Sequence, residues 1–226
     1  MRILVISDMH GNMTNLSKIV DTIDENKIDL VLSSGDFADD YQVPQGFDIL
    51  NIIDMFVQKI VALGKPFLAV PGNVDPLDII DVFEEYKINA HNKKQKIAGT
   101  TVIGWGGALT PFNTSFEPTE EETKTSLTKL GAGIKEDFIL LLHNPPKGIK
   151  LDLINDQHVG SQAIRDFIDK KQPLLAVSAH IHESPGIDKI GRTTVFYPGT
   201  VAEGKYGIID INGKTVKCQT KSISSA

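Results

Sequence analysis

Seven side chains that can donate a lone pair to a metal ion follow short apolar segments of this sequence. Four occur as pairs spaced two residues apart and three occur singly: Asp8 and His10, His180 and His182, and Asp36, Asn73 and His143. This mixture of carboxylate, imidazole and amide donors favours Mn, Fe, Zn, Co or Ni over Ca or Mg. Because seven donors are too many for one tetrahedral ion, we predict two divalent ions that share a bridging carboxylate and leave positions open for water and a substrate.

The two pairs carry the strongest spacing signal. Residues two apart in an extended chain point to the same side, so Asp8 with His10, and His180 with His182, can each present two ligands together. An Asp-x-His sequence alone is common by chance, whereas two imidazoles on one strand face are hard to satisfy otherwise. A lone histidine such as His143 is usually a packed core residue. The metal interpretation is preferable only for the whole ordered set, with each member after an apolar run.

Short apolar segments predict the strands that must position these donors. They cover residues 3–6, 30–32, 67–70, 101–103, 138–142, 174–177 and 195–197. Ligand sites in α/β sheets gather outside the carboxyl ends of the strands, and five of these segments end beside a donor. Gly35 and Gly72 permit tight turns that would aim Asp36 and Asn73 into the same site.

Amphipathic helices are predicted between several of these strands. We expect helices at residues 15–26 and 47–63, helix starts at Thr119 and Gly160-Ser161, and closing strands at 206–211 and 215–219 around an Asn212-Gly213 turn. The alternation of strands and helices predicts one layered α/β domain over residues 1–226.

The composition excludes several classes of protein. Lys and Arg number 23 against 29 Asp and Glu, a formal net charge of −6, whereas a general nucleic-acid binder needs a basic surface for phosphates. Cys218 is the single cysteine, so no internal disulfide can form and a cytoplasmic location is expected. The apolar segment at residues 3–6 turns polar at Ser7, far short of the ~20 residues that a membrane span needs. We expect neither nucleic acid nor membrane as a partner.

The ordered motifs resemble those of the calcineurin-like metallophosphoesterase superfamily, from residue 3 to about residue 200. The motifs are Asp8-x-His10, Gly35-Asp36, Gly72-Asn73-x-Asp75, His143 and His180-x-His182. Residues 143–148, 158–161 and 180–186 look like a prokaryotic, largely archaeal, branch of predicted phosphoesterases. The resemblance implies a four-layer αββα sandwich with a dimetal centre between two sheets. It assigns one metal to Asp8, His10, Asp36 and His182, and the other to Asp36, Asn73, His143 and His180.

The resemblance also implies an activity. Two ions would activate a bridging water as hydroxide for in-line attack on phosphorus, with Asp36, Asn73 and His143 acting through that water. A small-molecule phosphodiester is the first expected substrate, with manganese among the expected ions, and a phosphomonoester is the near alternative. From another class, a non-catalytic scaffold that binds proteins should have lost ligands, whereas all seven donors remain here. The oligomeric state stays open, a homo-oligomer included.

One departure from the family pattern bears on catalysis. Most members have a histidine where this chain has Val74, and that imidazole is thought to protonate the leaving oxygen. Valine cannot do so, and Asp75 would lose the partner that it orients. General acid catalysis typically contributes about 10²–10⁴-fold, so we expect slow hydrolysis of esters with poor leaving groups.

Other positions receive weaker expectations. Asp39 and Asp40 are interpreted as a solvated turn, and Tyr197-Pro-Gly stands where Asn-Pro-Gly is commoner, which would alter the support of the ligands. Residues 106–118 form a long loop of the kind that carries specificity. Trp105 and Phe112 flank that loop and form either a substrate wall or part of the core.

Overall fold

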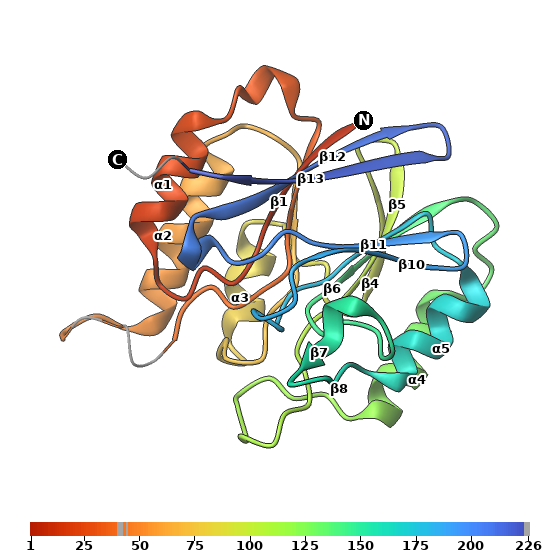
Figure 1. Ribbon diagram of the computed structural model, residues 1–226. Coiled ribbons are helices and arrows are strands. Elements are labelled where there is room, and N and C mark those ends of the chain that lie inside the picture. Colours follow the sequence, from red (N-terminus) through yellow and green to blue (C-terminus); the bar gives the residue numbers. More distant parts are fainter. Residues whose placement is uncertain (40–42, 44, 224–226) are drawn as a thin grey trace.

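Two β-sheets pack face to face, and helices cover the outer face of each (Figure 1). The structure is a computed structural model that describes residues 1–39, 43 and 45–223. Within these residues one sheet has five strands, in the order β13 (Thr215–Ser222), β12 (Lys205–Asn212), β1 (Arg2–Ile6), β2 (Leu30–Ser33) and β3 (Phe67–Ala69). The other has six, in the order β10 (Gly186–Ile190), β11 (Thr193–Tyr197), β9 (Leu175–Val177), β6 (Phe138–Leu142), β5 (Thr100–Trp105) and β4 (Lys93–Ile97).

Each sheet has its own layer of helices (Figure 1). The first sheet packs against α1 (Met13–Thr22), α2 (Ile49–Val61) and α3 (Ile79–Glu85), and the second against α4 (Glu120–Leu130) and α5 (Gln162–Lys171). A small hairpin of β7 (Leu153–Ile154) and β8 (Gln157–His158) stands apart from both sheets. This arrangement confirms the predicted four-layer αββα sandwich.

Strand β1 shows why its sequence is apolar without interruption. Ile3 and Val5 belong to the hydrophobic cluster between the two sheets, while Leu4 and Ile6 belong to the cluster beneath the helices. Side chains alternate between the faces of a strand, and both faces of this one are covered. A strand buried on both faces gives a continuous apolar run, as expected in the parallel part of a sheet.

Local signals in the sequence correctly marked several helix ends. Thr119 caps α4 with the reciprocal hydrogen bonds of a capping box, and the Ser161 hydroxyl accepts a hydrogen bond from the Ile164 amide at the start of α5. The first helix ends at Thr22, earlier than predicted, and a separate 3₁₀ turn follows at Glu25–Lys27. In the closing hairpin Asn212 pairs with Thr215, so the turn lies one residue later than predicted.

Several elements were not predicted, the β7–β8 hairpin among them. Helix α3 is short, and β10 has alternating rather than continuous burial. The basic segment that contains Lys93 and Lys96 forms β4 at the edge of the second sheet, with every second residue partly buried. Lysines on an edge strand discourage pairing with another chain. The high charge of this segment is therefore compatible with a strand, although it did not predict one.

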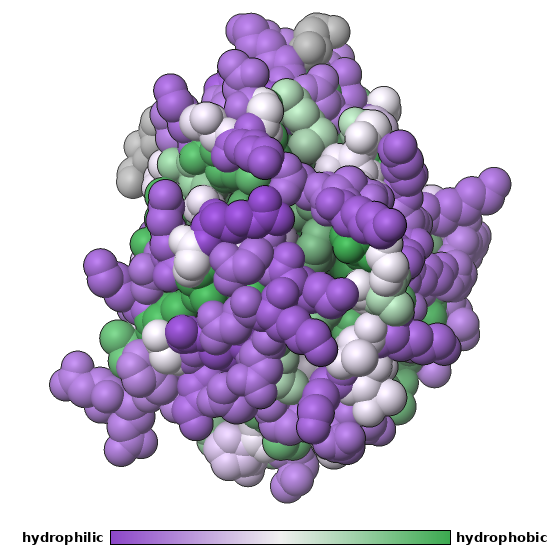
Figure 2. Space-filling model, turned by 90° about the vertical axis from the view of Figure 1, so that its right-hand side faces the viewer, coloured by the Kyte–Doolittle hydropathy of each residue, from purple (hydrophilic) through white to green (hydrophobic). Residues whose placement is uncertain are grey.

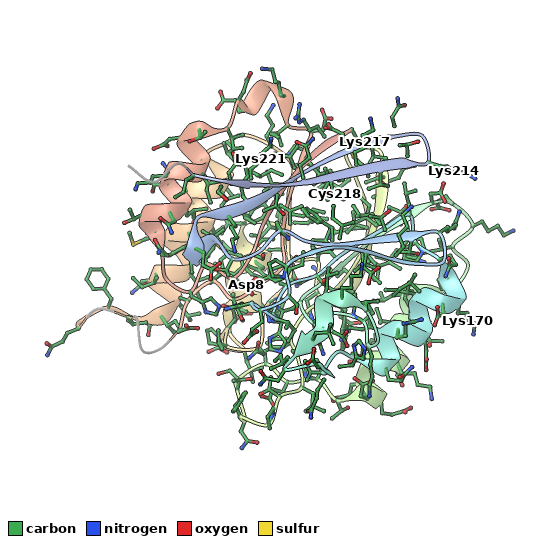
Figure 3. The ribbon with its side chains drawn as sticks, in the orientation of Figure 1. Asp8, Lys170, Lys214, Lys217, Cys218 and Lys221 are labelled. Carbon is green, nitrogen blue, oxygen red and sulfur yellow. The ribbon has the colours of Figure 1, made fainter. Side chains whose placement is uncertain are left out.

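The face shown in Figure 2 is covered largely by hydrophilic residues, and hydrophobic ones show mainly in the hollows between them. Figure 3 places Lys214, Lys217 and Lys221 on the outer hairpin and Lys170 on α5, all away from the central Asp8. Among the described residues no helix is both long and apolar enough to cross a membrane.

Candidate metal centre

The seven predicted donor residues lie together where strands from both sheets end. Donor atoms of Asp8, His10, Asp36 and His182 all lie within 4.8 Å of one another, and the same holds for Asp36, His143 and His180. Asn73 completes the second group, because its Oδ1 atom lies 3.0 Å from His143 Nε2. Asp36 belongs to both groups and therefore stands where a bridging ligand would be needed.

Nitrogen and oxygen atoms of the first group lie close together. The Nε2 atoms of His10 and His182 lie 3.2 Å apart. His10 Nε2 lies 3.7 Å from Asp36 Oδ2, and His182 Nε2 lies 3.5 Å from Asp8 Oδ1. In the second group His143 Nε2 lies 3.4 Å from the same Asp36 Oδ2. Such crowding of acceptor atoms is unfavourable without a cation or protons between them.

The two spaced pairs do not adopt the extended backbone on which their prediction rested. Strand β1 ends at Ile6, and Asp8 and His10 then have φ angles of 51° and 43°, in the left-handed region. His180 has a φ of 75°. A left-handed conformation costs a non-glycine residue roughly 1–3 kcal/mol and clusters at functional sites. The donors of each pair thus converge through tight turns rather than along one strand face.

Hydrogen bonds between loops hold these turns in place. The amides of Met9 and His10 both donate to the Asp36 carbonyl, at 2.7 and 3.0 Å, and the Asp8 amide donates to the Gly35 carbonyl at 2.9 Å. The loop after β1 is therefore fixed to the loop after β2, and their ligands keep a defined separation.

Two glycines are required by close packing rather than by free rotation alone. A Cβ atom added to Gly72 would overlap with the Asp36 carboxylate, and one added to Gly35 would overlap with the Gly72 amide. Gly35 also has a φ of 93°. Both positions therefore admit glycine only, as their predicted role in the tight turns requires.

Asp75 has a different role from the one expected. It was expected to orient a side chain at position 74. Its buried carboxylate instead accepts hydrogen bonds from the backbone amides of Asp36, Phe37 and Gly72 at 2.9, 2.8 and 2.7 Å. Burial and the charge of Asp36 raise the pKa of Asp75 to about 7 despite these donors. Asp75 fastens the Gly35-Asp36 turn to the Gly72-Asn73 turn.

Two of the candidate ligand histidines are oriented by hydrogen bonds at Nδ1. His143 Nδ1 lies 2.6 Å from the Ser34 carbonyl, which can only accept, so Nδ1 carries a proton and Nε2 faces the site. His10 Nδ1 lies 2.9 Å from Asp39 Oδ2. Metal-ligating histidines commonly donate their other N–H in this way. The solvated turn expected at Asp39 is therefore wrong, and Asp40 lies outside the described residues.

Electrostatics divide the two groups. Burial opposes charge on His10, but the Asp39 hydrogen bond and the Asp36 charge raise its pKa to about 9. The hydrogen bond to Asp8 likewise raises the pKa of His182. In the second group, burial and then the charge of His143 lower the pKa of His180 to about 3. Carboxylates thus favour protons on the first group, and desolvation keeps His180 neutral.

Asp8 provides the clearest test of whether a cation fits. Burial would raise its pKa, but the His182 hydrogen bond and the neighbouring imidazoles lower it to about 2, so the carboxylate is charged. Its Oδ2 atom is buried and, among the described residues, has no hydrogen-bond partner. The buried Tyr197 hydroxyl lies near Asp8, and burial, the Asp8 charge and a weak hydrogen bond with Asp8 raise its pKa, but it makes no hydrogen bond of good geometry to any described residue. A buried charged oxygen without a partner is costly, and a bound divalent ion would remove that cost.

Comparison with known proteins agrees with this geometry. Residues 1–184 match the sequence profile of the calcineurin-like phosphoesterase family. The chain belongs to this family. Calcineurin-like phosphoesterases are metal-dependent hydrolases of phosphate esters that use two divalent ions, and the two groups of donors are the candidates for holding them.

Three individual proteins are similar to this calcineurin-like phosphoesterase. The uncharacterized protein MJ1162 of Methanocaldococcus jannaschii is 34% identical over 208 residues, which cover 88% of each chain. The crystal structure of TT1561 from Thermus thermophilus has a TM-score of 0.77 at 22% identity over 99% of each chain. A dimetal phosphatase from Danio rerio has a TM-score of 0.66 at 11% identity, again over 99% of each chain. The two structures establish the likeness of the fold.

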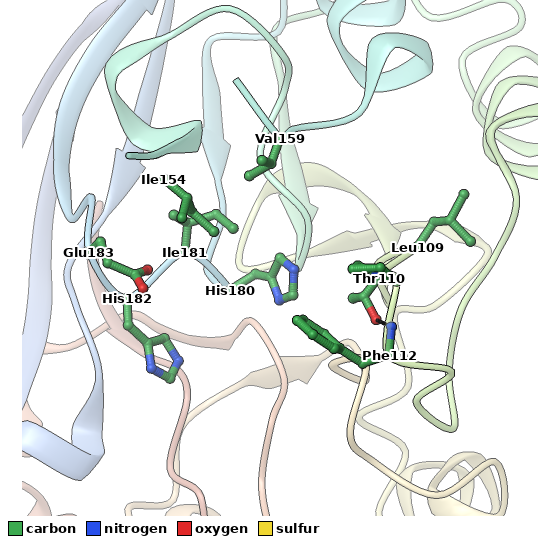
Figure 4. Close-up of a pocket in the computed structure, with 10 residues that line it drawn as sticks. Leu109, Thr110, Phe112, Ile154, Val159, His180, Ile181, His182 and Glu183 are labelled. Atoms are coloured by element: carbon green, nitrogen blue, oxygen red, sulfur yellow. Dashed lines mark hydrogen bonds between the residues drawn. The ribbon is translucent and has the colours of Figure 1, made fainter. Parts of the chain in front are cut away.

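A pocket of about 330 Å³ opens beside the candidate metal centre of this phosphoesterase. His180 and His182 form part of its wall, and the ring of Phe112 points toward His180 across it (Figure 4). Phe112 is therefore a wall residue. Trp105 instead packs in the core, where its indole N–H donates to the Thr123 hydroxyl at 3.0 Å.

Proposed function

We propose that this calcineurin-like phosphoesterase is a dimetal phosphodiesterase that hydrolyses a small-molecule ester. The observation that carries the proposal is the convergence of seven donors around Asp36, with the buried Asp8 Oδ2 left for a cation. When bound, two divalent ions would supply a water nucleophile at neutral pH and neutralise the charge that develops on the phosphoryl group. Asp8, His10, Asp36 and His182 would hold one ion, and Asp36, Asn73, His143 and His180 the other.

The residues around Asp36 would position the reacting groups. The Val74 amide donates to Asp36 Oδ1 at 3.2 Å, and Asp75 fixes the Asp36 backbone. Asn73 is held from its other side, since its amide nitrogen donates to the Thr114 hydroxyl at 3.1 Å. With Asp36 and Asn73 oriented by these contacts and His143 by Ser34, the donor set needs little rearrangement when an ion binds.

The charge of the pocket favours a diester over a monoester. None of the described residues that line the pocket is a lysine or arginine, and Glu183 adds a carboxylate to its wall. A phosphomonoester carries a charge of about −1.5 to −2 at neutral pH, whereas a diester carries −1. A site without side-chain cations beyond its metal ions suits the singly charged ester.

The same donor set argues against the scaffold alternative. A protein that uses this fold only to bind partners has no use for a buried carboxylate oxygen without a partner, which lowers stability.

The hydrophobic cluster shared by both sheets supports the proposal that residues 1–226 form one domain.

A substrate screen with controlled metal content tests the proposed function. Protein stripped with a chelator is assayed on bis(p-nitrophenyl) phosphate and p-nitrophenyl phosphate, without metal and then with Mn²⁺. We expect no hydrolysis without metal and faster hydrolysis of the diester with Mn²⁺. Faster hydrolysis of the monoester would favour the phosphomonoesterase alternative. Absence of both metal binding and Mn²⁺-stimulated hydrolysis would favour the scaffold.

A further inference from the structure

We infer that the pocket beside the metal centre is a subsite for an apolar aromatic leaving group, so that the substrates are aryl phosphodiesters. This inference rests on the proposed function. The pocket shares His180 and His182 with the metal centre, so a group bound in it lies next to the phosphorus atom that the metal ions would hold.

The walls of the pocket are apolar and face one another. Phe112 lies on one side, and Ile154, Val159 and Ile181 lie on the other (Figure 4). Phe112 is 78% exposed and Val159 is 42% exposed, an unusual exposure for apolar side chains that flank one cavity. Burying such surface against an apolar ligand is favourable, whereas the Glu183 carboxylate repels an anionic one.

The loops that carry these walls are hydrogen-bonded, so the pocket is built before a ligand binds. The buried Asp152 carboxylate accepts from the amides of Gly148, Ile149 and Gly160, at 3.0, 2.9 and 3.1 Å, and so shapes the segment that bears Val159. The Ser184 hydroxyl donates to the Leu153 carbonyl at 2.7 Å and joins the β7–β8 hairpin to the loop of His182.

The opposite wall is fixed in a similar way. Glu117 accepts hydrogen bonds from the Thr110 hydroxyl at 2.6 Å and from the Thr114 amide at 2.7 Å, which closes the loop around Phe112.

The size of the pocket is also sufficient for an aromatic ring, because an apolar cavity of about 150 Å³ holds benzene and this pocket measures about 330 Å³. One substituted aromatic ring therefore fits in it.

The missing proton donor points to the same class of leaving group. In hydrolysis the water oxygen bonds to phosphorus, the bond from phosphorus to the leaving oxygen breaks with its electron pair on that oxygen, and the protons of water pass to solvent or to the products. Val74 offers no proton to the leaving oxygen. A phenolic oxygen, with a pKa near 10 as in tyrosine, departs as an anion far more readily than an alkoxide.

Binding of two phosphonates tests the subsite without requiring turnover. Phenylphosphonate and methylphosphonate carry the same anionic group and differ in the ring alone. Calorimetry on Mn²⁺-loaded protein is expected to give at least tenfold tighter binding of phenylphosphonate. Phe112→Ala should reduce this ratio at least threefold with metal content unchanged, and Phe47→Ala, which removes a ring that is 56% exposed and outside the pocket, should not change it.

The outcomes separate the two proposals. Equal affinity for the two phosphonates, or a ratio that Phe112→Ala and Phe47→Ala change alike, would overturn the subsite and leave the proposed function standing. Absence of binding by both phosphonates would also overturn the subsite, whereas absence of Mn²⁺-dependent hydrolysis of bis(p-nitrophenyl) phosphate would overturn the proposed function and the subsite with it.

Discussion

The two proposed metal positions share Asp36 but differ in charge and solvation. Position A (Asp8, His10, Asp36 and His182) has two carboxylates, and its His182 side chain is 39% exposed. Position B (Asp36, Asn73, His143 and His180) has one carboxylate and the fully buried His143. In position A carboxylates raise the pKa of both histidines, whereas in position B burial lowers that of His180.

Similar residues therefore form two positions that differ in how protons compete with a metal ion. Position B presents a neutral His180 at neutral pH, so an ion binds to the lone pair of its ring without displacing a proton. At position A an ion must displace a proton from His10, which the neighbouring carboxylates hold charged. Position A gains more from the charge of a cation, but its affinity depends more on pH.

The largest expected effect comes from the residue that both positions share. Asp36→Asn should lower the rate of Mn²⁺-dependent diester hydrolysis by more than about 100-fold. Loss of an outer-shell partner costs about 10–100-fold, and this variant loses the charged ligand that both positions share. Metal content and initial rates are measured on the same sample. Asp21→Asn is the matched control, since Asp21 pairs with Lys59 on the helix-covered side and is 69% exposed. Retained activity in Asp36→Asn would contradict the proposal that Asp36 is a ligand shared by both positions.

The dependence of metal binding on pH distinguishes the two positions directly. His10, with a pKa of about 9, is protonated at pH 7 and must become neutral to bind, so affinity at position A should rise by about tenfold per pH unit from about 6.5 to 9. Affinity at position B should change less with pH, since burial lowers the pKa of His180 to about 3. Mn²⁺ titrations at several pH values measure both steps.

Asp39→Asn sharpens that prediction. Loss of the Asp39 charge lowers the pKa of His10, so the rise of Mn²⁺ affinity at position A should move to lower pH. The pH profile of position B should stay unchanged. Identical pH profiles for both steps in the unmodified protein would contradict the division into positions A and B.

A smaller effect is expected from the residue that holds the turns of both positions. In Asp75→Asn one carboxylate oxygen becomes an NH₂ group that faces backbone N–H donors, and an unmet buried donor costs about 1–3 kcal/mol. Urea unfolding of the metal-free protein should show this loss of stability. No change in the unfolding midpoint would mean that the three amide contacts of Asp75 do not hold the turns.

The smallest effect is expected at Val74. Its side chain offers neither a ligand nor a proton, so Val74→Ala should leave hydrolysis of bis(p-nitrophenyl) phosphate within about threefold. The rate per bound Mn²⁺ is the measurement. A fall of about 100-fold with metal content intact, the scale of a lost general acid, would show that this position is not catalytically silent.

Sequence reasoning found the site because buried strands leave a strong signal. The runs before Asp8, Asp36 and His143 are apolar throughout, since both faces of each sheet are covered, and their ends therefore mark one edge. The left-handed turns at Asp8 and His180 were not predictable, because φ angles there are set by hydrogen bonds between loops distant in sequence.

The supporting residues left weaker signals. Asp39 follows a Gly-Asp turn and has the composition of a solvated loop, yet the fold brings it to His10, and only three-dimensional proximity identifies that contact. Asp75 was noticed for its place beside Val74, but its backbone partners arise from the packing of two turns. The β7–β8 wall of the pocket is held by Asp152, whose role depends on amides on both sides of it in the chain.

The most direct test of the central claim is the number of Mn²⁺ ions that bind to one chain. Calorimetric titration of chelator-stripped protein at pH 8, with inorganic metal analysis of the loaded product, should give two ions per chain in separable steps. Asp36→Asn should weaken both steps. A chain that binds no Mn²⁺, or that binds it with unchanged affinity after Asp36→Asn, would contradict the claim that the seven donors form a dimetal centre.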